Sequence, residues 1–355
     1  MSADDFLMDL LRTPSVSGFE EAIQARVRAQ AETWADAIDS DVHGNLFASV
    51  NPRGNPRVML SGHCDQIGML VGHIDADGFV WPQTVGGLEG QEWLGHRLTI
   101  WTGRGPVPAA LCRKPIHLLK SAEKTAAVTL EDLWIDLGAN DREQARALVG
   151  IGDPITVDLL PTEFPNGLVC SPGLDNAAGL WVCLEAARRA KQLGRDRPLA
   201  AAVIAASTVQ EEIGLRGAQT AAHGANPHVA VAVDVTHASD FPTASPRQRG
   251  EVRLGGGPVI MRGPNVNRRV FERLTDLARD RQIPHQVIAV GKAAPNEGAV
   301  LQVSRSGIAT GLIGIPNRYM HSPCEICHRG DLDAAADLLA AFCASLTDED
   351  DLVPS

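Results

Sequence analysis

The sequence predicts an α/β fold with helices on both faces of a sheet, interrupted by a smaller all-β insert. Beyond about residue 165, expected helices (177–193, 270–281, 332–346) alternate with buried strands (199–208, 228–236, 308–315). This alternation is typical of βαβ units. From Met69 to about Leu160, short alternating runs separated by glycine and proline indicate β structure instead. We therefore expect a discontinuous α/β domain, residues 1–68 and 163–355, around an insert at 69–162.

The N-terminal residues, from 1 to about 70, are expected to form a helix followed by strands. The first segment is expected to be an amphipathic helix with one apolar face, formed by Phe6, Leu7, Leu10 and Leu11. Residues 41–50 are expected to form a strand pair with a turn at 43–45, and 57–62 a short buried strand.

The composition narrows the class of protein. The chain has 355 residues, 44% hydrophobic and 21% charged, with a net charge of −11, which is ordinary for a globular protein. The acidic balance argues against nucleic acid as a partner. We find no signal peptide and no apolar run of about 18 residues, so no membrane partner is expected. Seven cysteines without disulfide-like spacing indicate a reducing compartment, and we expect a cytoplasmic protein.

Acidic and imidazole side chains gather where the predicted strands end, which is where open α/β sheets place their ligands. Five candidates stand there or at the start of the helix near 177: His63, Asp175, Glu212, Asp234 and His321. Each alone has an ordinary alternative. His63 and Asp234 could be loop residues, Asp175 could cap a helix, and a single histidine such as His321 is more often structural.

Two further acids have a suggested role beside these candidates. In His63-Cys64-Asp65, the aspartate could orient a histidine that binds a metal through its other nitrogen. The adjacent Glu211 and Glu212 follow about ten apolar or small residues, so they repel each other and lose solvation. Such a pair suits two roles, one glutamate binding a metal and the other accepting a proton from water.

Taken together, the candidates indicate an open catalytic metal site. Carboxylate and imidazole without thiolate favour Zn, Co or Mn, and two ions roughly 3.5–4 Å apart could share one carboxylate. Cys324 and Cys327 form a single CxxC, which we interpret as incidental. The glycines at 255–257 lack the Lys-Ser/Thr of a phosphate loop, and no covalent nucleophile stands out.

Motifs along almost the whole chain carry a family resemblance. In order they are TPSVSGFE, DVHGNL, SGHCDQIGMLV, KPIHLL, LWIDLGA, GDPITVD, SPGLDNAAGLWVCLEA, TVQEEIGLRGA, VAVDVTHASD, LGGGPVI and IPNRYMHSPCE. TVQEEIGLRGA and RYMHSP are highly specific in combination. On these motifs the chain resembles the glutamyl aminopeptidase and "cellulase M"-type family of co-catalytic metallopeptidases, which includes the tetrahedral aminopeptidases.

The resemblance implies a hydrolase, a dinuclear metallo-aminopeptidase that removes N-terminal residues from short peptides. It implies two divalent ions per subunit, Zn or Co, on a mixed-sheet zinc-peptidase domain with a β-barrel-like insert for dimerisation. It also implies a homo-oligomer, dimers assembling to a dodecamer. The implied roles are these: His63 and Asp234 hold one metal, Glu212 and His321 the other, Asp175 bridges them, Glu211 deprotonates the bridging water, and Asp65 supports His63.

Some positions depart from the family pattern. Gln66, Asn176 and Ala177 stand where the family usually has Glu, Asp and Arg, and residues 292–298 replace its Gly-Thr-Asp element. The altered segment leaves a dedicated amidase or dipeptidase for one small metabolite as an alternative. A non-catalytic assembly protein would need lost ligands, and none is lost. A glycosidase fits badly, because it needs an acid and a base or nucleophile flanking a sugar.

Overall fold

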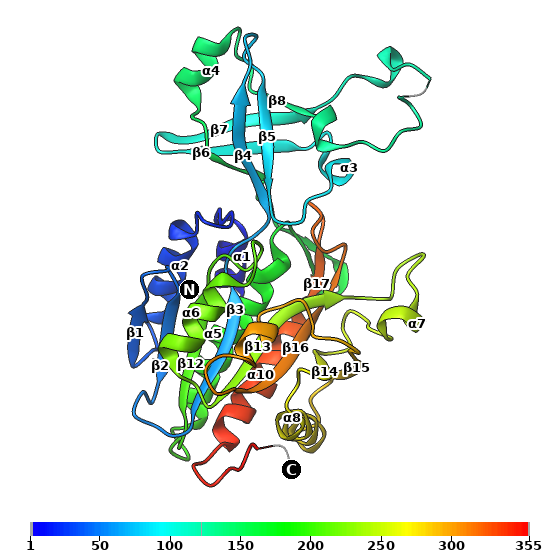
Figure 1. Ribbon diagram of the computed structural model, residues 1–355. Coiled ribbons are helices and arrows are strands. Elements are labelled where there is room, and N and C mark those ends of the chain that lie inside the picture. The colour runs from blue at the N-terminus through cyan, green and yellow to red at the C-terminus, as the bar shows by residue number, and fades with distance from the viewer. Residues whose placement is uncertain (1–2, 122, 354–355) are drawn as a thin grey trace.

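The computed structural model describes residues 3–121 and 123–353, which form a large α/β part and a small β-barrel stacked upon it (Figure 1). The α/β part holds an eleven-stranded mixed sheet, and the barrel is closed by six strands. The predicted fold class is therefore confirmed. Within the described residues, no helix has the length and apolar character needed to cross a membrane.

Four parallel strands form the centre of the large sheet, in the order β12–β3–β13–β16. They are β12 (Ala202–Thr208), β3 (Arg57–His63), β13 (Val229–His237) and β16 (Ala309–Arg318). Almost every residue in them is buried on both faces, as their continuous apolar runs predict. Because these strands are parallel, their carboxyl ends meet at one edge of the sheet.

Shorter strands extend this centre on both sides, with antiparallel pairing to it. On one side lie β1 (Ala37–Ser40) and β2 (Leu46–Val50). On the other lie β17 (Ile326–His328), β11 (Leu168–Cys170), β10 (Thr162–Phe164), β14 (Val259–Arg262) and β15 (Gln286–Ala289).

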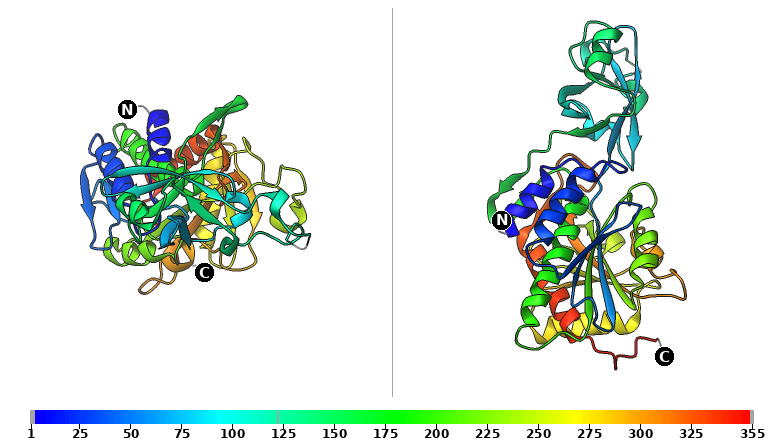
Figure 2. Two further views of the ribbon diagram at one scale, coloured as in Figure 1. Left: turned by 90° about the horizontal axis from the view of Figure 1, so that it is seen from above. Right: turned by 90° about the vertical axis from the view of Figure 1, so that its left-hand side faces the viewer.

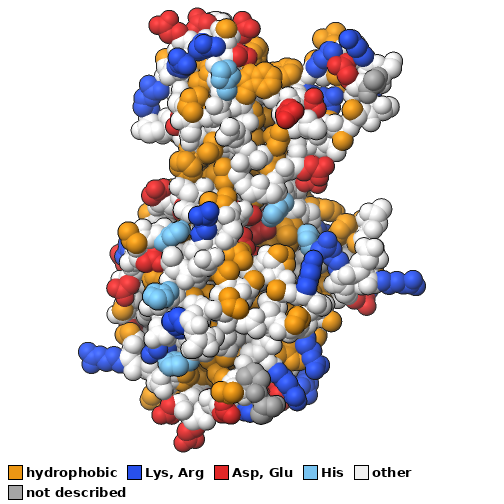
Figure 3. Space-filling view, in the orientation of Figure 1, with side chains coloured by type: hydrophobic (Ala, Val, Ile, Leu, Met, Phe, Trp, Pro, Cys, Tyr) orange, Lys and Arg blue, Asp and Glu red, His pale blue; other side chains and the backbone are white. Residues whose placement is uncertain are grey.

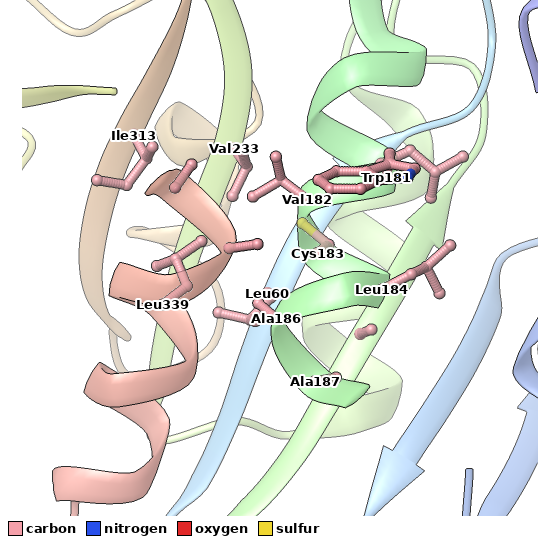
Figure 4. Close-up of a cluster of buried hydrophobic side chains, with 14 of the residues drawn as sticks. Leu60, Trp181, Val182, Cys183, Leu184, Ala186, Ala187, Val233, Ile313 and Leu339 are labelled. Carbon is pink, nitrogen blue, oxygen red and sulfur yellow. The ribbon is translucent and has the colours of Figure 1, made fainter. Parts of the chain in front are cut away.

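Helices cover both faces of the sheet (Figure 2). One face carries α1 (Ala3–Leu11), α2 (Glu21–Ala31), α5 (Leu174–Leu193), α8 (Arg268–Asp280) and α10 (Arg329–Ser345). The other face carries α6 (Arg216–Ala225) and α9 (Gly298–Leu301). In Figure 4, α5 packs Val182 and Ala186 between the strands and Leu339 of α10. This packing fixes the start of α5 against the carboxyl ends of the strands.

The barrel interrupts the α/β part after β3. Its strands are β4 (Gly68–Ile74), β5 (Val80–Val85), β8 (Trp134–Asp136), β7 (Gly105–Cys112), β6 (Arg97–Thr102) and β9 (Pro154–Val157), in order around the barrel. A separate apolar cluster that includes Met69, Ile100 and Ile135 fills it. The short elements α3 (Gly90–Trp93) and α4 (Arg142–Leu148) lie between these strands, and α7 (Pro246–Arg249) follows β13.

Most local expectations near the N-terminus are confirmed. The four apolar residues expected on one face of the first helix are all buried. The strand pair was placed wrongly, because its first strand is β1 at 37–40 and residues 41–45 form the turn. The carboxylate of Asp41 accepts hydrogen bonds from the backbone N–H groups of His43 and Asn45. Such a side-chain bond favours a turn over a strand.

Candidate metal centre

Six candidate side chains meet at the carboxyl ends of the parallel strands. His63 ends β3, Asp234 lies in β13, Glu211 and Glu212 follow β12, His321 follows β16, and Asp175 stands at the start of α5. Figure 3 shows acidic and histidine side chains in the hollow between the barrel and the α/β part. The sheet edge and the start of one helix therefore bring together residues 258 positions apart.

The first group of potential ligands is His63, Asp175 and Asp234, whose donor atoms all lie within 4.8 Å of one another. Nε2 of His63 is 3.3 Å from Oδ1 of Asp175 and 3.6 Å from Oδ1 of Asp234. The other nitrogen, Nδ1, lies 3.0 Å from the backbone carbonyl of Asp65. If Nδ1 carries the proton and donates to that carbonyl, Nε2 is left free to bind a cation.

The second group is Asp175, Glu212 and His321, and it shares Asp175 with the first. Nε2 of His321 is 3.3 Å from Oδ2 of Asp175 and 3.6 Å from Oε2 of Glu212. Asp175 does not cap α5, since the N-cap position is Gly173 and no side chain caps the helix there. Its two oxygens face two different histidines, which is the arrangement of a shared ligand.

Asp65 supports the centre in a way that the sequence did not suggest. Its carboxylate lies 3.6 Å from Nδ1 of His63. It also accepts the backbone N–H groups of Glu211 and Glu212, at 3.0 and 3.1 Å, and the hydroxyl of Ser17. Asp65 therefore fixes the turn that carries both glutamates, in addition to lying beside the histidine ring.

Two groups that hold His321 were not among the site residues predicted from the sequence. Glu325 is buried, and its Oε1 accepts the backbone N–H of His321 at 2.8 Å. The backbone carbonyl of Gly87, in the insert, lies 2.9 Å from Nδ1 of His321. Glu325 belongs to the motif IPNRYMHSPCE, which gave the only signal in the sequence. Nothing in the sequence pointed to Gly87, because a backbone carbonyl has no residue signature.

The comparisons with known proteins bear directly on this geometry. The family model described as "M42 glutamyl aminopeptidase" matches residues 44–338. The chain belongs to this family. It is similar to the lysyl aminopeptidase of Pyrococcus furiosus, at 31% identity over 348 residues, which covers 96% of this chain and 97% of that protein.

Two solved structures show the same similarity in three dimensions. One is a TET aminopeptidase from a marine-sediment Thaumarchaeota archaeon, with a TM-score of 0.92 and 30% identity, covering 97% of this chain and 96% of that one. The other is the TET1 peptidase of Pyrococcus horikoshii, with a TM-score of 0.84 and 28% identity, covering 97% and 100%. With the potential ligand groups in place, this member of the glutamyl aminopeptidase family is a metal-dependent aminopeptidase, a hydrolase of peptide bonds.

Burial raises the pKa values of acidic residues in this site. Burial raises the pKa of Glu211 to about 9. His63 lowers this pKa, whereas the nearby acids Asp234, Glu212 and Asp175 raise it. Burial and Asp175 likewise raise the pKa of Glu212 to about 8. Without a cation, these carboxyl groups therefore hold protons near neutral pH. A bound divalent cation reverses this preference, because it favours the ionised carboxylate.

One orphaned atom tests whether the residues fit a metal. Oε1 of Glu212 is buried and has no hydrogen-bond partner among the described residues. A buried carboxylate oxygen without a partner is costly, and a cation would satisfy it. The donor set of imidazole and carboxylate is also the one that catalytic Zn and similar ions take. The residues present fit divalent metal ions.

The departures from the family pattern have visible contacts. Gln66 donates to the hydroxyl of Ser15 at 3.1 Å. Asn176 donates to the carbonyl of Val233 in β13 and accepts the N–H of Gly179, so it ties α5 to the sheet. These amides stabilise the scaffold around Asp175 without adding charge to the centre.

Glu297, in the altered segment, is a buried acid that sequence reasoning passed over. Its carboxylate accepts the hydroxyls of Ser61 in β3, at 2.7 Å, and of Thr208 in β12. Thr208 is in register with His63. Glu297 therefore anchors the segment 292–297, part of the pocket wall, directly beneath the strand ends that carry the centre.

The cysteines stay apart from this chemistry. All seven are free thiols. Cys324 is exposed and Cys327 is buried in β17, and neither belongs to a potential metal-binding group of the described residues. This is in line with interpreting the CxxC as incidental.

Proposed function

We propose that the chain holds two divalent cations and uses them to cleave the first peptide bond of short peptides. His63 and Asp234 would hold one ion, Glu212 and His321 the other, and Asp175 would bind both. The observation that carries this proposal is that the two oxygens of Asp175 each lie 3.3 Å from a different histidine.

The residues around the ions have distinct tasks. When bound, a pair of divalent cations polarises the substrate carbonyl and increases the acidity of water. Glu211 belongs to neither ligand group, yet it lines the same pocket, with Oε2 4.0 Å from Nε2 of His63. Its carboxylate would accept a proton from the attacking water and pass that proton to the leaving amine. Asp65 would position Glu211 through the backbone.

We propose Zn or Co as the metal, because the donors are imidazole and carboxylate without thiolate. For the assembly, we propose a homo-oligomer, with a dodecamer built from dimers as the specific form. Support comes from the similar TET1 peptidase of Pyrococcus horikoshii, which assembles into a tetrahedron or an octahedral shell. In a closed shell of this kind, only short peptides would reach the pocket. We also propose a cytoplasmic location, in keeping with seven free thiols.

Glu211→Gln tests the catalytic assignment. The amide keeps the shape of the side chain but cannot take a proton, so we expect turnover to fall by about 10²–10⁴-fold with bound metal unchanged. The matched control is Glu163→Gln, at an exposed position on β10. Metal content and rates on a panel of aminoacyl chromogenic substrates give the two readouts. A Glu211→Gln enzyme with the wild-type rate would exclude Glu211 as the base.

A dedicated amidase or dipeptidase for one metabolite is the second candidate, favoured by the altered segment 292–298, which lines part of the pocket. Aminoacyl amides compared with N-acylated dipeptides separate the two. Turnover of several aminoacyl amides supports the aminopeptidase, whereas turnover confined to one acylated compound supports the amidase.

A further inference from the structure

We propose that the pocket beside the metal centre contains a carboxylate-binding subsite formed by Lys292 and Arg249. This inference rests on the proposed function and deepens it, because it names a second charged group that the preferred substrate carries. Both residues line the same cavity as the metal-centre acids, and its volume is about 810 Å³. That size suits a small ligand such as a short peptide.

The lining of this cavity carries charges of both signs. The only carboxylates among its lining residues are four acids of the metal centre, Asp175, Glu211, Glu212 and Asp234. Lys292 and Arg249 are the lysine and arginine of the lining, and both are exposed. In the same view as Figure 1, Lys and Arg side chains lie beside the hollow that holds the acidic and histidine side chains (Figure 3).

These two cations have no carboxylate partner among the described residues, although many of the chain's arginines do. Arg318 pairs with Asp240, for example, and Arg273 pairs with Asp350. A lysine and an arginine that face a cavity without an ion pair remain available to an anionic ligand.

The segments that carry Lys292 and Arg249 pack against each other beside the cavity. Lys292 lies three residues beyond the end of β15, and Arg249 ends α7. The next residue, Gly250, packs against Ile288 of β15 so closely that an added Cβ would lie 2.7 Å from its Cγ2. Ile288 and Val290 add apolar side chains to the same lining.

Substrate chemistry then decides what binds there. An aminopeptidase substrate carries an ammonium group, which the acids of the metal centre attract. A carboxylate on the same molecule would be attracted to Lys292 and Arg249, because arginine offers paired donors and lysine a point charge. That carboxylate has two possible sources, the side chain of an acidic N-terminal residue or the C-terminus of a dipeptide or tripeptide.

The test compares substrates that differ only in one charge. Glutamyl and glutaminyl p-nitroanilides form one pair, and a dipeptide such as Leu-Gly and its C-terminal amide form the other. We expect the metal-loaded wild type to favour the carboxylate member of at least one pair about tenfold or more in kcat/KM. Lys292→Met and Arg249→Met should each reduce that ratio several-fold. Lys124→Met, in the insert, is the control and should leave the ratio unchanged.

The two pairs distinguish the sources. A ratio that falls only for the p-nitroanilides assigns the subsite to an acidic side chain, and one that falls only for the dipeptides assigns it to the C-terminus. Equal rates within both pairs in the wild type would overturn the proposal. So would variants that change all substrates in parallel, because the cations would then act only as counter-charges to the metal centre.

A binding measurement keeps the subsite testable apart from catalysis. Calorimetry on the metal-loaded protein can compare glutamic acid α-amide with glutamine α-amide, and Gly-Gly with its amide. Tighter binding of one carboxylate member, lost in Lys292→Met, supports the subsite even if no peptide is hydrolysed, which would count against the proposed function alone. Equal dissociation constants within both pairs would overturn the subsite even in an active peptidase.

Discussion

The backbone N–H of Asp175 donates a 2.8 Å hydrogen bond to Oε2 of Glu325, which lies 150 residues further along the chain. The other oxygen of Glu325 accepts the backbone N–H of His321 at 2.8 Å. One buried carboxylate thus fixes the backbones of two potential ligands. On the other side of the centre, Asp65 does the same for Glu211 and Glu212. Two buried acids therefore position the side chains on which the proposed chemistry depends.

Glu325→Gln is expected to weaken metal binding by about 10- to 100-fold, the usual effect of losing a group that orients ligands. A glutamine offers one acceptor oxygen, and its NH₂ would face one of the two backbone N–H groups. Activity at limiting metal should fall and recover when metal is added. Titration in a metal buffer measures the affinity, with Glu163→Gln as the exposed control. An unchanged affinity would contradict the positioning role.

Asp65→Asn should lower kcat more than it raises KM. Both oxygens of Asp65 accept backbone N–H groups from the turn that carries Glu211, and an amide can replace only one of them. A small displacement of a catalytic group costs about 10²-fold in rate, and we expect a loss of that order. Ser17→Ala removes a single hydrogen bond to Asp65 and should have a smaller effect. Steady-state kinetics decide, and a kcat of Asp65→Asn within twofold of wild type would refute this role.

Removing the metal should destabilise the protein and abolish activity. A ligand that binds only the folded state at 1,000 times its dissociation constant stabilises it by about 4 kcal/mol. The chelated protein should regain stability as pH falls from 8.5 to 6. Burial raises the pKa of Glu211 to about 9 and of Glu212 to about 8, so the folded state binds more protons than the unfolded one in this range. Thermal unfolding with and without chelator measures both effects, and identical curves would argue against a metal site.

Glu297→Gln should stabilise the chelated protein at pH 8 and have little effect at pH 5. Burial raises the pKa of Glu297 to about 7, although the hydrogen bonds from the hydroxyls of Thr208 and Ser61 lower it. Its contribution to stability is therefore complete below its ordinary pKa of 4.5 and is lost as pH rises through about 7. The loss is on the order of 3 kcal/mol, and a permanently neutral glutamine avoids it. Urea unfolding at pH 5 and at pH 8 measures the difference in stability between the variant and the wild type. A difference that is the same at both pH values would contradict this prediction.

Much of the fold could be predicted from the sequence because hydrophobic periodicity is a local property. The apolar face of α1 and the buried runs of β3, β12, β13 and β16 follow directly from it. The prediction was wrong at residues 41–45, where the side chain of Asp41 bonds to the backbone and makes a turn. A side-chain bond of that kind competes with the pattern of apolar residues and leaves no periodic signal.

The chain's motifs also identified the acids and histidines that the structure brings together. They could not show which partners hold them. Glu325 and Glu297 lie in the sequence as ordinary glutamates, and only packing reveals that both are buried and bonded to groups far away in the chain. The carbonyl of Gly87 has no signature at all, because backbone groups are common to every residue.

The sequence by itself determined the architecture, the family resemblance and the residue types of a metal centre, since these depend on local pattern and side-chain chemistry. Tertiary structure alone decided that Asp175 stands between two histidines, that buried acids fix the backbones of potential ligands, and that Lys292 lines the cavity of the centre. These relationships join segments from separate strands, helices and loops. Their distances are set when the sheet and its helices pack, and no short stretch of the chain contains them.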